Sequence, residues 1–267
     1  MIYSFSTFKS KRMKLQKHAG ILLTLFFIVQ LLNGQESRYS FEVFKNDKGD
    51  SLLYRSMLSD ANSFDKLPLV IFLHGSGERG SDNVSQLKWG AMQFASDEFI
   101  KMFPCVVIAP QCPRGTGWGN YVRDGNGFKL ADSPSKTMEL LHELILKVKN
   151  SGFIDSNRIY ITGLSMGGIG TFDALARYPE LFAAAMPVCG AGDTAMASRF
   201  SKIPMWIIGG AEDGAVSPEE SYKMADALRK EGARPGLTIY PDVGHFSWVQ
   251  AYSDMLHIQW LFRQRKP

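Results

Sequence analysis

A serine flanked by glycines, in Gly163-Leu164-Ser165-Met166-Gly167, is the pattern with the clearest chemical potential in this chain. It follows the apolar, β-branched run 158–162 and precedes a helix-like segment that begins at Gly168. Strand, sharp turn and helix are the setting of a nucleophile elbow, in which the serine is backbone-strained and the nearby glycines let the chain pass. We therefore expect the Ser165 hydroxyl to be an exposed nucleophile at the positive end of a helix.

A serine alcohol becomes nucleophilic only when an imidazole removes its proton and a carboxylate orients that imidazole. His245 lies on a Gly-His turn after the apolar run Leu237–Tyr240, and we expect it to be the base. Asp213 follows another apolar run, Met205–Ile208, and is the expected acid, which gives the chain order Ser, Asp, His.

Several other polar residues compete for these roles. Glu212 and Asp193 are the alternative acids. Packing, turn or surface positions are expected for the remaining candidates, namely His142, His257, Asp242 and Asp254, while His18 lies in the N-terminal segment.

A glycine-rich loop, His74-Gly75-Ser76-Gly77-Glu78-Arg79-Gly80, follows the apolar run 68–73. Its glycine spacing formally matches a dinucleotide-binding fingerprint, but Ser81-Asp82-Asn83 follows the third glycine where an amphipathic helix should open. We interpret the loop as one side of an oxyanion hole, with the Ser76 amide paired with that of Met166. His74 is expected to order this loop, although it could also be taken for the base.

A second loop, Gln111–Tyr121, is long and rich in glycine, as binding loops often are. We expect Gln111, Trp118 and Trp248 to contact the substrate. The alternative for the two tryptophans is that their rings cover the core, and packing is the expected role of Trp89.

The elements that would position these residues alternate along the chain. A hairpin of 39–44 and 51–58 is followed by apolar runs at 68–73, 105–109, 158–162, 183–188, 205–208 and 237–240. Helices are expected at about 84–99, from Ser133-Pro134 through Val148, at 168–178, at 218–231 and at 248–263. This pattern predicts an α/β fold: one domain with a mostly parallel sheet of about eight strands, helices on both faces and an antiparallel N-terminal hairpin. Ligands of such sheets bind at the carboxyl ends of the strands.

The first 34 residues have the composition of a secretory signal peptide. Five basic residues, from Lys9 to Lys17, precede the apolar run Ala19–Leu32 and the small polar residues that end near Gly34. Met13 could equally be the start, and an uncleaved anchor is the alternative to cleavage. We expect 1–34 to direct export to the periplasm or outside the cell, and 35–267 to be the catalytic domain.

Charge and cysteines restrict the partners. Without residues 1–34 the chain has 25 basic and 26 acidic residues, a net charge of −1, so nothing points to nucleic acid. Cys105, Cys112 and Cys189 are expected to be buried or half-buried thiols, with a Cys112–Cys189 disulfide as the alternative. No metal-ligand spacing joins Cys, His and acidic residues, so we expect neither metal nor cofactor.

These motifs together resemble the α/β-hydrolase superfamily. The segments that carry the resemblance are 73–80, Ala109-Pro110-Gln111-Cys112-Pro113, Gly163–Gly168 and Pro241-Asp242-Val243-Gly244-His245, within a match that covers most of 39–264. They are similar in particular to the bacterial secreted phospholipase/carboxylesterase-like and "predicted peptidase" branch, and to feruloyl, acetyl-xylan and polyhydroxybutyrate-depolymerase-type esterases. One departure is Glu212–Val216, where relatives often have a hydrophobic pair after the acid.

The resemblance implies a triad of Ser165, Asp213 and His245 with Ser76 and Met166 as oxyanion amides. It implies a serine esterase that forms an acyl-enzyme on a small-molecule or polysaccharide-linked ester. A prolyl-oligopeptidase-like serine peptidase is one alternative, and an inactive carbohydrate-binding protein on the same scaffold is another. No stable membrane association is expected after cleavage, and the sequence leaves the oligomeric state open.

Overall fold

The computed structural model describes residues 34–59, 66–124 and 127–266. The chain divides into two units, Met1–Arg38 and Tyr39–Pro267. The signal-peptide prediction falls almost wholly on residues 1–33, which lie outside the described residues. Within the described ranges, no helix combines the length and the apolar character that a membrane span needs.

The strands of the second unit form an eight-stranded sheet among the described residues, in the order β1-β2-β4-β3-β7-β8-β9-β10. β1 and β2 pair with each other, and β2 pairs with β4, in antiparallel register; all the other neighbours are parallel. The bounds are β1 Ser40–Lys45, β2 Ser51–Leu58, β3 Leu67–Leu73, β4 Val106–Pro110, β7 Ile154–Leu164, β8 Ala184–Val188, β9 Trp206–Gly210 and β10 Gly236–Tyr240. The sheet class predicted from the sequence is thus confirmed.

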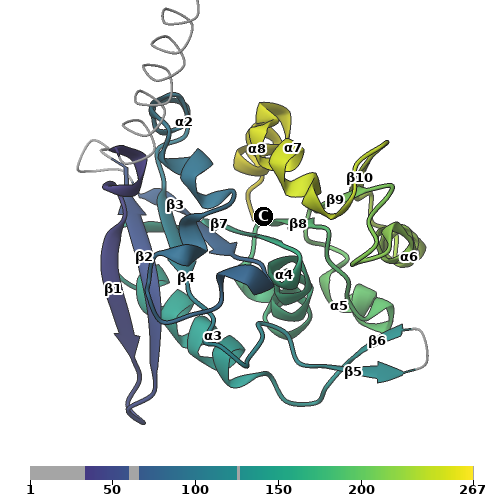
Figure 1. Cartoon of the computed structure of the whole chain (residues 1–267), viewed down its shortest axis with the longest axis horizontal. Helices are drawn as coiled ribbons and strands as arrows, with labels where there is room; N and C mark the ends of the chain where they lie inside the picture. Colours follow the sequence, from purple (N-terminus) through teal and green to yellow (C-terminus); the bar gives the residue numbers. More distant parts are fainter. Residues whose placement is uncertain (1–33, 60–65, 125–126, 267) are drawn as a thin grey trace, which may run out of the picture. The chain divides into compact units, whose positions relative to one another are not determined.

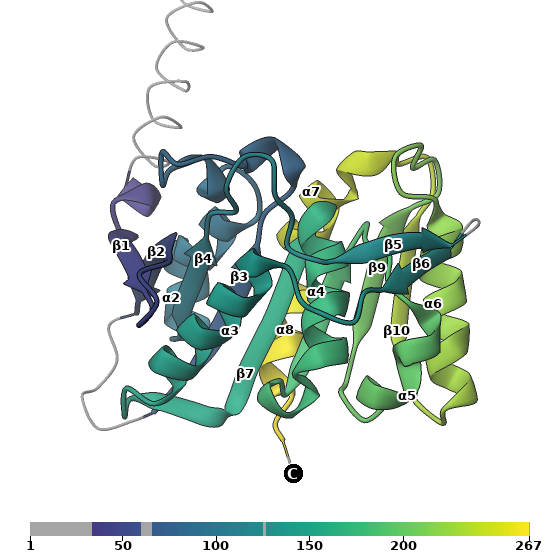
Figure 2. The same cartoon turned by 90° about the horizontal axis from the view of Figure 1, so that it is seen from below.

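Helices cover both faces of this sheet (Figures 1 and 2). Leu69, Ile71 and Leu73 of β3 pack into one core with α3 (Lys136–Lys149), α4 (Met166–Arg177) and α6 (Pro218–Lys230). Val70 and Phe72 point to the opposite core, because successive strand residues alternate between faces. That core also contains residues of α2 (Asp97–Met102), α7 (Trp248–Ser253) and α8 (Met255–Arg263).

Two predicted helices are broken in the structure. The segment expected as one helix over 84–99 forms the short 3-10 turns η2 (Ser85–Leu87) and η3 (Ala91–Ala95) and then α2. Gly90 separates the two turns with a φ of 70°, a value that favours glycine. The last predicted helix divides at Asp254, whose side chain accepts a hydrogen bond from the Leu256 amide and caps α8.

Two local predictions near the Gln111–Tyr121 loop are also corrected. α3 is capped by Ser135 and not by Ser133, because the Ser135 hydroxyl accepts a hydrogen bond from the Met138 amide. The same hydroxyl donates to the carbonyls of the preceding loop. Past that loop lies an unpredicted hairpin of β5 (Tyr121–Asp124) and β6 (Gly127–Leu130), tied to Asp193 through the Leu130 amide.

Candidate active site

The turn between β7 and α4 carries Ser165 in a strained conformation. Its φ is 53° and its ψ is −116°, outside the regions that non-glycine residues usually occupy. A Cβ on Gly163 would lie 2.5 Å from the Gly167 carbonyl oxygen, and one on Gly167 would overlap the Leu73 carbonyl. Only glycine fits at both positions, so the strain and the glycine requirement expected from the motif are present in the structure.

Three side chains that are far apart in the sequence meet at the end of the sheet. His245 Nε2 lies 2.9 Å from Ser165 Oγ, and His245 Nδ1 lies 2.8 Å from Asp213 Oδ2. Because a carboxylate only accepts, Nδ1 donates to Asp213 and Nε2 is left to accept the Ser165 proton. This chain of hydrogen bonds can turn the serine into a nucleophile.

Asp213 is held more firmly than its role as a partner of His245 requires. Its other oxygen, Oδ1, accepts hydrogen bonds from the amides of Ala215 and Val216 at 2.8 and 2.9 Å. The side chain is 1% exposed. A buried carboxylate with three donors is fixed in orientation and position.

The two alternative acids lie elsewhere. Glu212 is exposed, and no hydrogen bond among the described residues joins it to His245. Asp193 Oδ1 accepts from the Ala195 amide and Oδ2 from the Leu130 amide, so its carboxylate caps a turn and holds β6. Of the three acids considered, the structure places Asp213 alone beside His245.

The loops after β9 and β10 are joined by their backbones. The Glu212 amide donates to the Val243 carbonyl at 2.9 Å. A Cβ on Gly210 would overlap the carbonyls of Val243 and Gly244, so the two chains are in direct contact. This contact sets the position of the acid relative to the base.

The two amides expected to bind an oxyanion lie on loops that meet at the elbow. Ser76 begins the 3-10 turn η1 (Ser76–Glu78), and Met166 begins α4, so neither amide has an acceptor within its own helix. No acceptor for either amide is found among the described residues. Gly75 approaches Leu164 closely, and Gly167 lies against the Leu73 and His74 carbonyls. These contacts join the loop after β3 to the turn between β7 and α4. Two amides without an acceptor in the described chain, on loops that meet at the elbow, are of the kind that can bind an oxyanion.

His74 is buried beneath this loop and organises it. Its Nδ1 lies 2.6 Å from the Gly75 carbonyl and its Nε2 accepts from the Cys112 amide at 2.9 Å. Burial lowers the pKa of His74 to about 4, so the ring is neutral at pH 7. These contacts match the loop-ordering role expected from the sequence.

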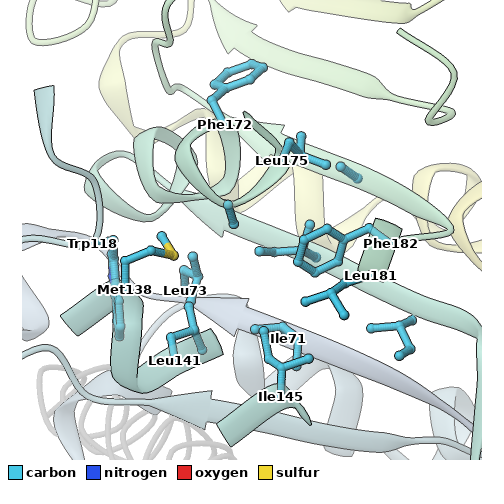
Figure 3. Packing of buried hydrophobic residues seen from close by; sticks show 14 of the residues in the cluster. Ile71, Leu73, Trp118, Met138, Leu141, Ile145, Phe172, Leu175, Leu181 and Phe182 are labelled. Atoms are coloured by element: carbon cyan, nitrogen blue, oxygen red, sulfur yellow. The ribbon is translucent and has the colours of Figure 1, made fainter. Parts of the chain in front are cut away.

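Two of the three predicted substrate contacts are wrong. Gln111 is 1% exposed and its amide is fully used: Nε2 donates to the Glu78 carbonyl and to Asp82, and Oε1 accepts from the Asn83 amide. Trp118 is fully buried and lies in the core beneath α4 (Figure 3). Its indole N–H donates to the His74 carbonyl at 3.0 Å. Both side chains hold loops, and neither has a surface to offer a substrate.

Trp248 packs against the candidate base. Its ring centroid lies 5.2 Å from that of His245 in an edge-to-face arrangement, and its side chain is buried at 6% exposure. Phe246 and Trp89 pack on Trp248 at 4.6 and 6.2 Å. Phe246 and Glu78 were not among the predicted site residues. Phe246 directly follows His245 in a segment rich in aromatic residues. Glu78, which bonds to Trp89, lies two residues past Ser76.

All three cysteines are free and buried, as expected, and they form no disulfide in the described chain. Cys189 lies beneath the site, and its Sγ forms with Asp213 and His245 the one described group whose ligand atoms are close enough to hold a metal, within 4.8 Å of one another. Burial raises the pKa of Cys189 to about 12, which keeps the thiol protonated and a poor ligand. Asp213 and His245 already bond to each other.

Comparison with known proteins places the chain in a family. Residues 61–260 match the Phospholipase/Carboxylesterase family. The chain is 23% identical over 154 residues to a bifunctional acetylxylan esterase/xylanase of Neocallimastix patriciarum, and 27% identical over 154 residues to acetylxylan esterase A of Emericella nidulans. These matches cover 57% and 54% of this chain, but 20% and 47% of the two relatives.

A solved structure is also similar. The crystal structure of a thermostable esterase superimposes with a TM-score of 0.80 at 37% identity, over 86% of this chain and 64% of the esterase chain. The chain therefore spans less than two thirds of each of these three proteins.

Proposed function

The chain belongs to the phospholipase/carboxylesterase family, and we propose that it is a serine hydrolase that cleaves carboxylic esters through an acyl-enzyme. The observation that carries this proposal is the unbroken chain of hydrogen bonds from Asp213 through His245 to Ser165. Its orientation is the one that activates an alcohol, and the likeness to a thermostable esterase at 37% identity supports ester chemistry.

In the proposed mechanism, Ser165 Oγ attacks the ester carbonyl while His245 Nε2 takes the hydroxyl proton. Asp213 stabilises the imidazolium that forms. Charge on the carbonyl oxygen is bound by the amides of Ser76 and Met166. His245 then returns its proton to the departing alkoxide, which leaves an acyl group on Ser165, and a water activated by the same imidazole releases the acid.

The direct test is covalent labelling with a fluorophosphonate, together with hydrolysis of p-nitrophenyl acetate. The wild-type chain should be labelled and should turn the ester over, and Ser165→Ala should lose both with an unchanged circular dichroism spectrum. Ser198→Ala is the matched control, because Ser198 is exposed on α5 (Ala197–Phe200). Labelling of Ser165→Ala would contradict the assignment of the nucleophile, and no labelling of the wild type would indicate an inactive binding protein.

Substrate and location belong to the same proposal. Two relatives are named acetylxylan esterases, which supports a small-molecule or polysaccharide-linked ester. A panel of methyl ferulate, acetylated xylan, short p-nitrophenyl esters and a peptide amide should show ester turnover above amide turnover; the reverse would support the peptidase alternative. We propose export directed by residues 1–34, and N-terminal sequencing of protein from the periplasm or medium should find a start near residue 35.

A further inference from the structure

Three aromatic side chains gather next to His245. Trp248 packs edge-to-face on the imidazole, with 5.2 Å between centroids, and Phe246 lies 4.6 Å from Trp248. Trp89 completes the group at 6.1 Å from Phe246 and 6.2 Å from Trp248. We call Trp89, Phe246 and Trp248 the three-ring surface.

The rings of this surface differ sharply in exposure. Trp248 is 6% exposed, whereas Phe246 is 58% exposed and Trp89 is partly buried. A lone exposed phenylalanine is unremarkable on a protein surface. Here the exposed ring rests on two others beside a candidate catalytic imidazole, so it forms part of a supported apolar surface at the reaction centre.

The surface is anchored to the loop that carries the oxyanion amides. The Glu78 carboxylate accepts a hydrogen bond from the side chain of Trp89, and its burial raises the pKa of Glu78. Glu78 lies in η1, two residues past Ser76, and Lys88 Nζ lies 5.3 Å from the centroid of Trp89. Trp89 is therefore held by contacts other than the one with Phe246.

The closeness of the rings to the His245 imidazole indicates which half of a substrate they meet. In ester hydrolysis the acyl group stays on Ser165, while the alcohol leaves after it takes a proton from His245 Nε2. A group bonded to the alcohol oxygen must therefore pass next to the imidazole. The rings that pack on and beyond the imidazole are then neighbours of the alcohol half.

We propose that the three-ring surface is an alcohol-side subsite that selects esters whose alcohol carries a flat ring. This rests on the proposed ester hydrolysis. An aryl ring and the C–H face of a pyranose share the required chemistry, a flat face of low polarity that can lie against Phe246 and Trp89. Aromatic side chains stack on or meet such faces edge-on at centroid distances like those already present in the cluster.

Four acetates test the proposal, because they all form the same acetyl-enzyme and differ only in the alcohol: benzyl acetate, a monoacetylated methyl xylopyranoside, n-hexyl acetate and ethyl acetate. Phe246→Ala should lower kcat/KM about tenfold for at least one ring-bearing acetate relative to ethyl acetate, which should change by less than about twofold. Phe246→Trp should restore the preference, and Phe246→Leu, which is apolar but not flat, should not.

Two controls separate the effect from general damage. Phe41→Ala makes the same change at a phenylalanine of similar exposure, 62%, on the edge strand β1, and should leave all four values unchanged. The rate of fluorophosphonate labelling should be the same in Phe246→Ala as in the wild type, because the triad is intact. Loss on the benzyl ester alone would identify an aryl alcohol, and loss on the pyranoside alone a sugar.

Two results would overturn the proposal. One is an equal change for all four acetates; the other is a loss confined to ethyl benzoate, which would place the rings on the acyl side. If the wild type hydrolyses no ester and takes no label, the proposed function itself fails. If the enzyme is active but Phe246→Ala keeps the wild-type preference for ring-bearing acetates over ethyl acetate, only the subsite proposal is refuted.

Discussion

Ser165 lies between two loops that are built in opposite ways. In the loop after β3 the histidine points inward: His74 is 1% exposed, as is Gln111, which follows β4 and donates to the Glu78 carbonyl of this loop. The loop after β10 turns side chains outward, with His245 at 22% side-chain exposure and Phe246 at 58%. The first loop therefore shows mainly its backbone at the elbow, and the second exposes an imidazole and a phenyl ring.

The difference follows from what each side must do. An oxyanion is best stabilised by dipoles that are already fixed, and buried hydrogen bonds to His74 and Gln111 fix the backbone of the first loop. A proton carrier must reach both serine and leaving group, so its side chain has to be accessible. One side of the candidate site is thus held by buried hydrogen bonds, and the other carries accessible side chains.

The largest effect should come from breaking the acid on the exposed side. Asp213→Asn should lower kcat/KM for p-nitrophenyl acetate by about 10⁴-fold, because an amide can donate to Nδ1 and so favours the wrong imidazole tautomer. Glu212→Gln, one residue away and exposed, should keep near wild-type activity. A loss of less than about tenfold in Asp213→Asn would remove this residue from the mechanism.

Next in size is the close contact between the elbow and the β3 loop. Gly167→Ala should lower the free energy of unfolding by more than about 3 kcal/mol, because its Cβ would overlap the Leu73 carbonyl. Gly77→Ala should change it by less than about 1 kcal/mol, since a Cβ there meets nothing within 4 Å. Urea unfolding measures both, and equal stability would show that the elbow is not tightly packed.

The protein should become less stable at acid pH because His74 is buried in its neutral form. In the unfolded chain this ring gains a proton below about pH 6.5, whereas the folded chain resists protonation until about pH 4. The free energy of unfolding therefore has its full value, as far as His74 is concerned, above pH 6.5. It falls as the pH drops towards 4, by roughly 3 kcal/mol in all.

His74→Gln removes this titration, so its unfolding free energy should decline less between pH 7 and pH 4 than that of the wild type. Chemical denaturation at a series of pH values gives the two slopes. Parallel slopes would mean that His74 takes up its proton at the same pH in the folded and the unfolded chain.

The smallest expected effect concerns Trp118, which the sequence predicts to contact the substrate and the structure places in the core. Trp118→Phe should cost about 1–2 kcal/mol of stability, because it removes the hydrogen bond to the His74 carbonyl and some core volume. KM for p-nitrophenyl acetate should stay the same. Unaltered stability with a raised KM would return Trp118 to the substrate pocket.

Hydrophobic periodicity and short motifs were sufficient to predict the sheet, the elbow and the three residues that meet at the end of the sheet. Alternating apolar runs and helical segments predicted the eight-stranded sheet, since the need to bury strands on both faces is local and repetitive. Gly163 and Gly167 marked the elbow because only glycine can stand so close to another backbone. The order of Ser165, Asp213 and His245 along the chain then identified the residues that the structure brings together.

Side-chain direction was not accessible in the same way. Gln111 and Trp118 lie in the segment after β4, and Trp248 begins α7 soon after β10. Nothing in their sequence neighbours tells an inward side chain from an outward one. The partners that decide this are distant: Trp118 is held by the His74 carbonyl and Trp248 by the rings of His245 and Trp89. Burial depends on which segments meet in space, so only the folded chain shows that Trp118 lies beneath the loop after β3 and that Trp248, also buried, packs against His245.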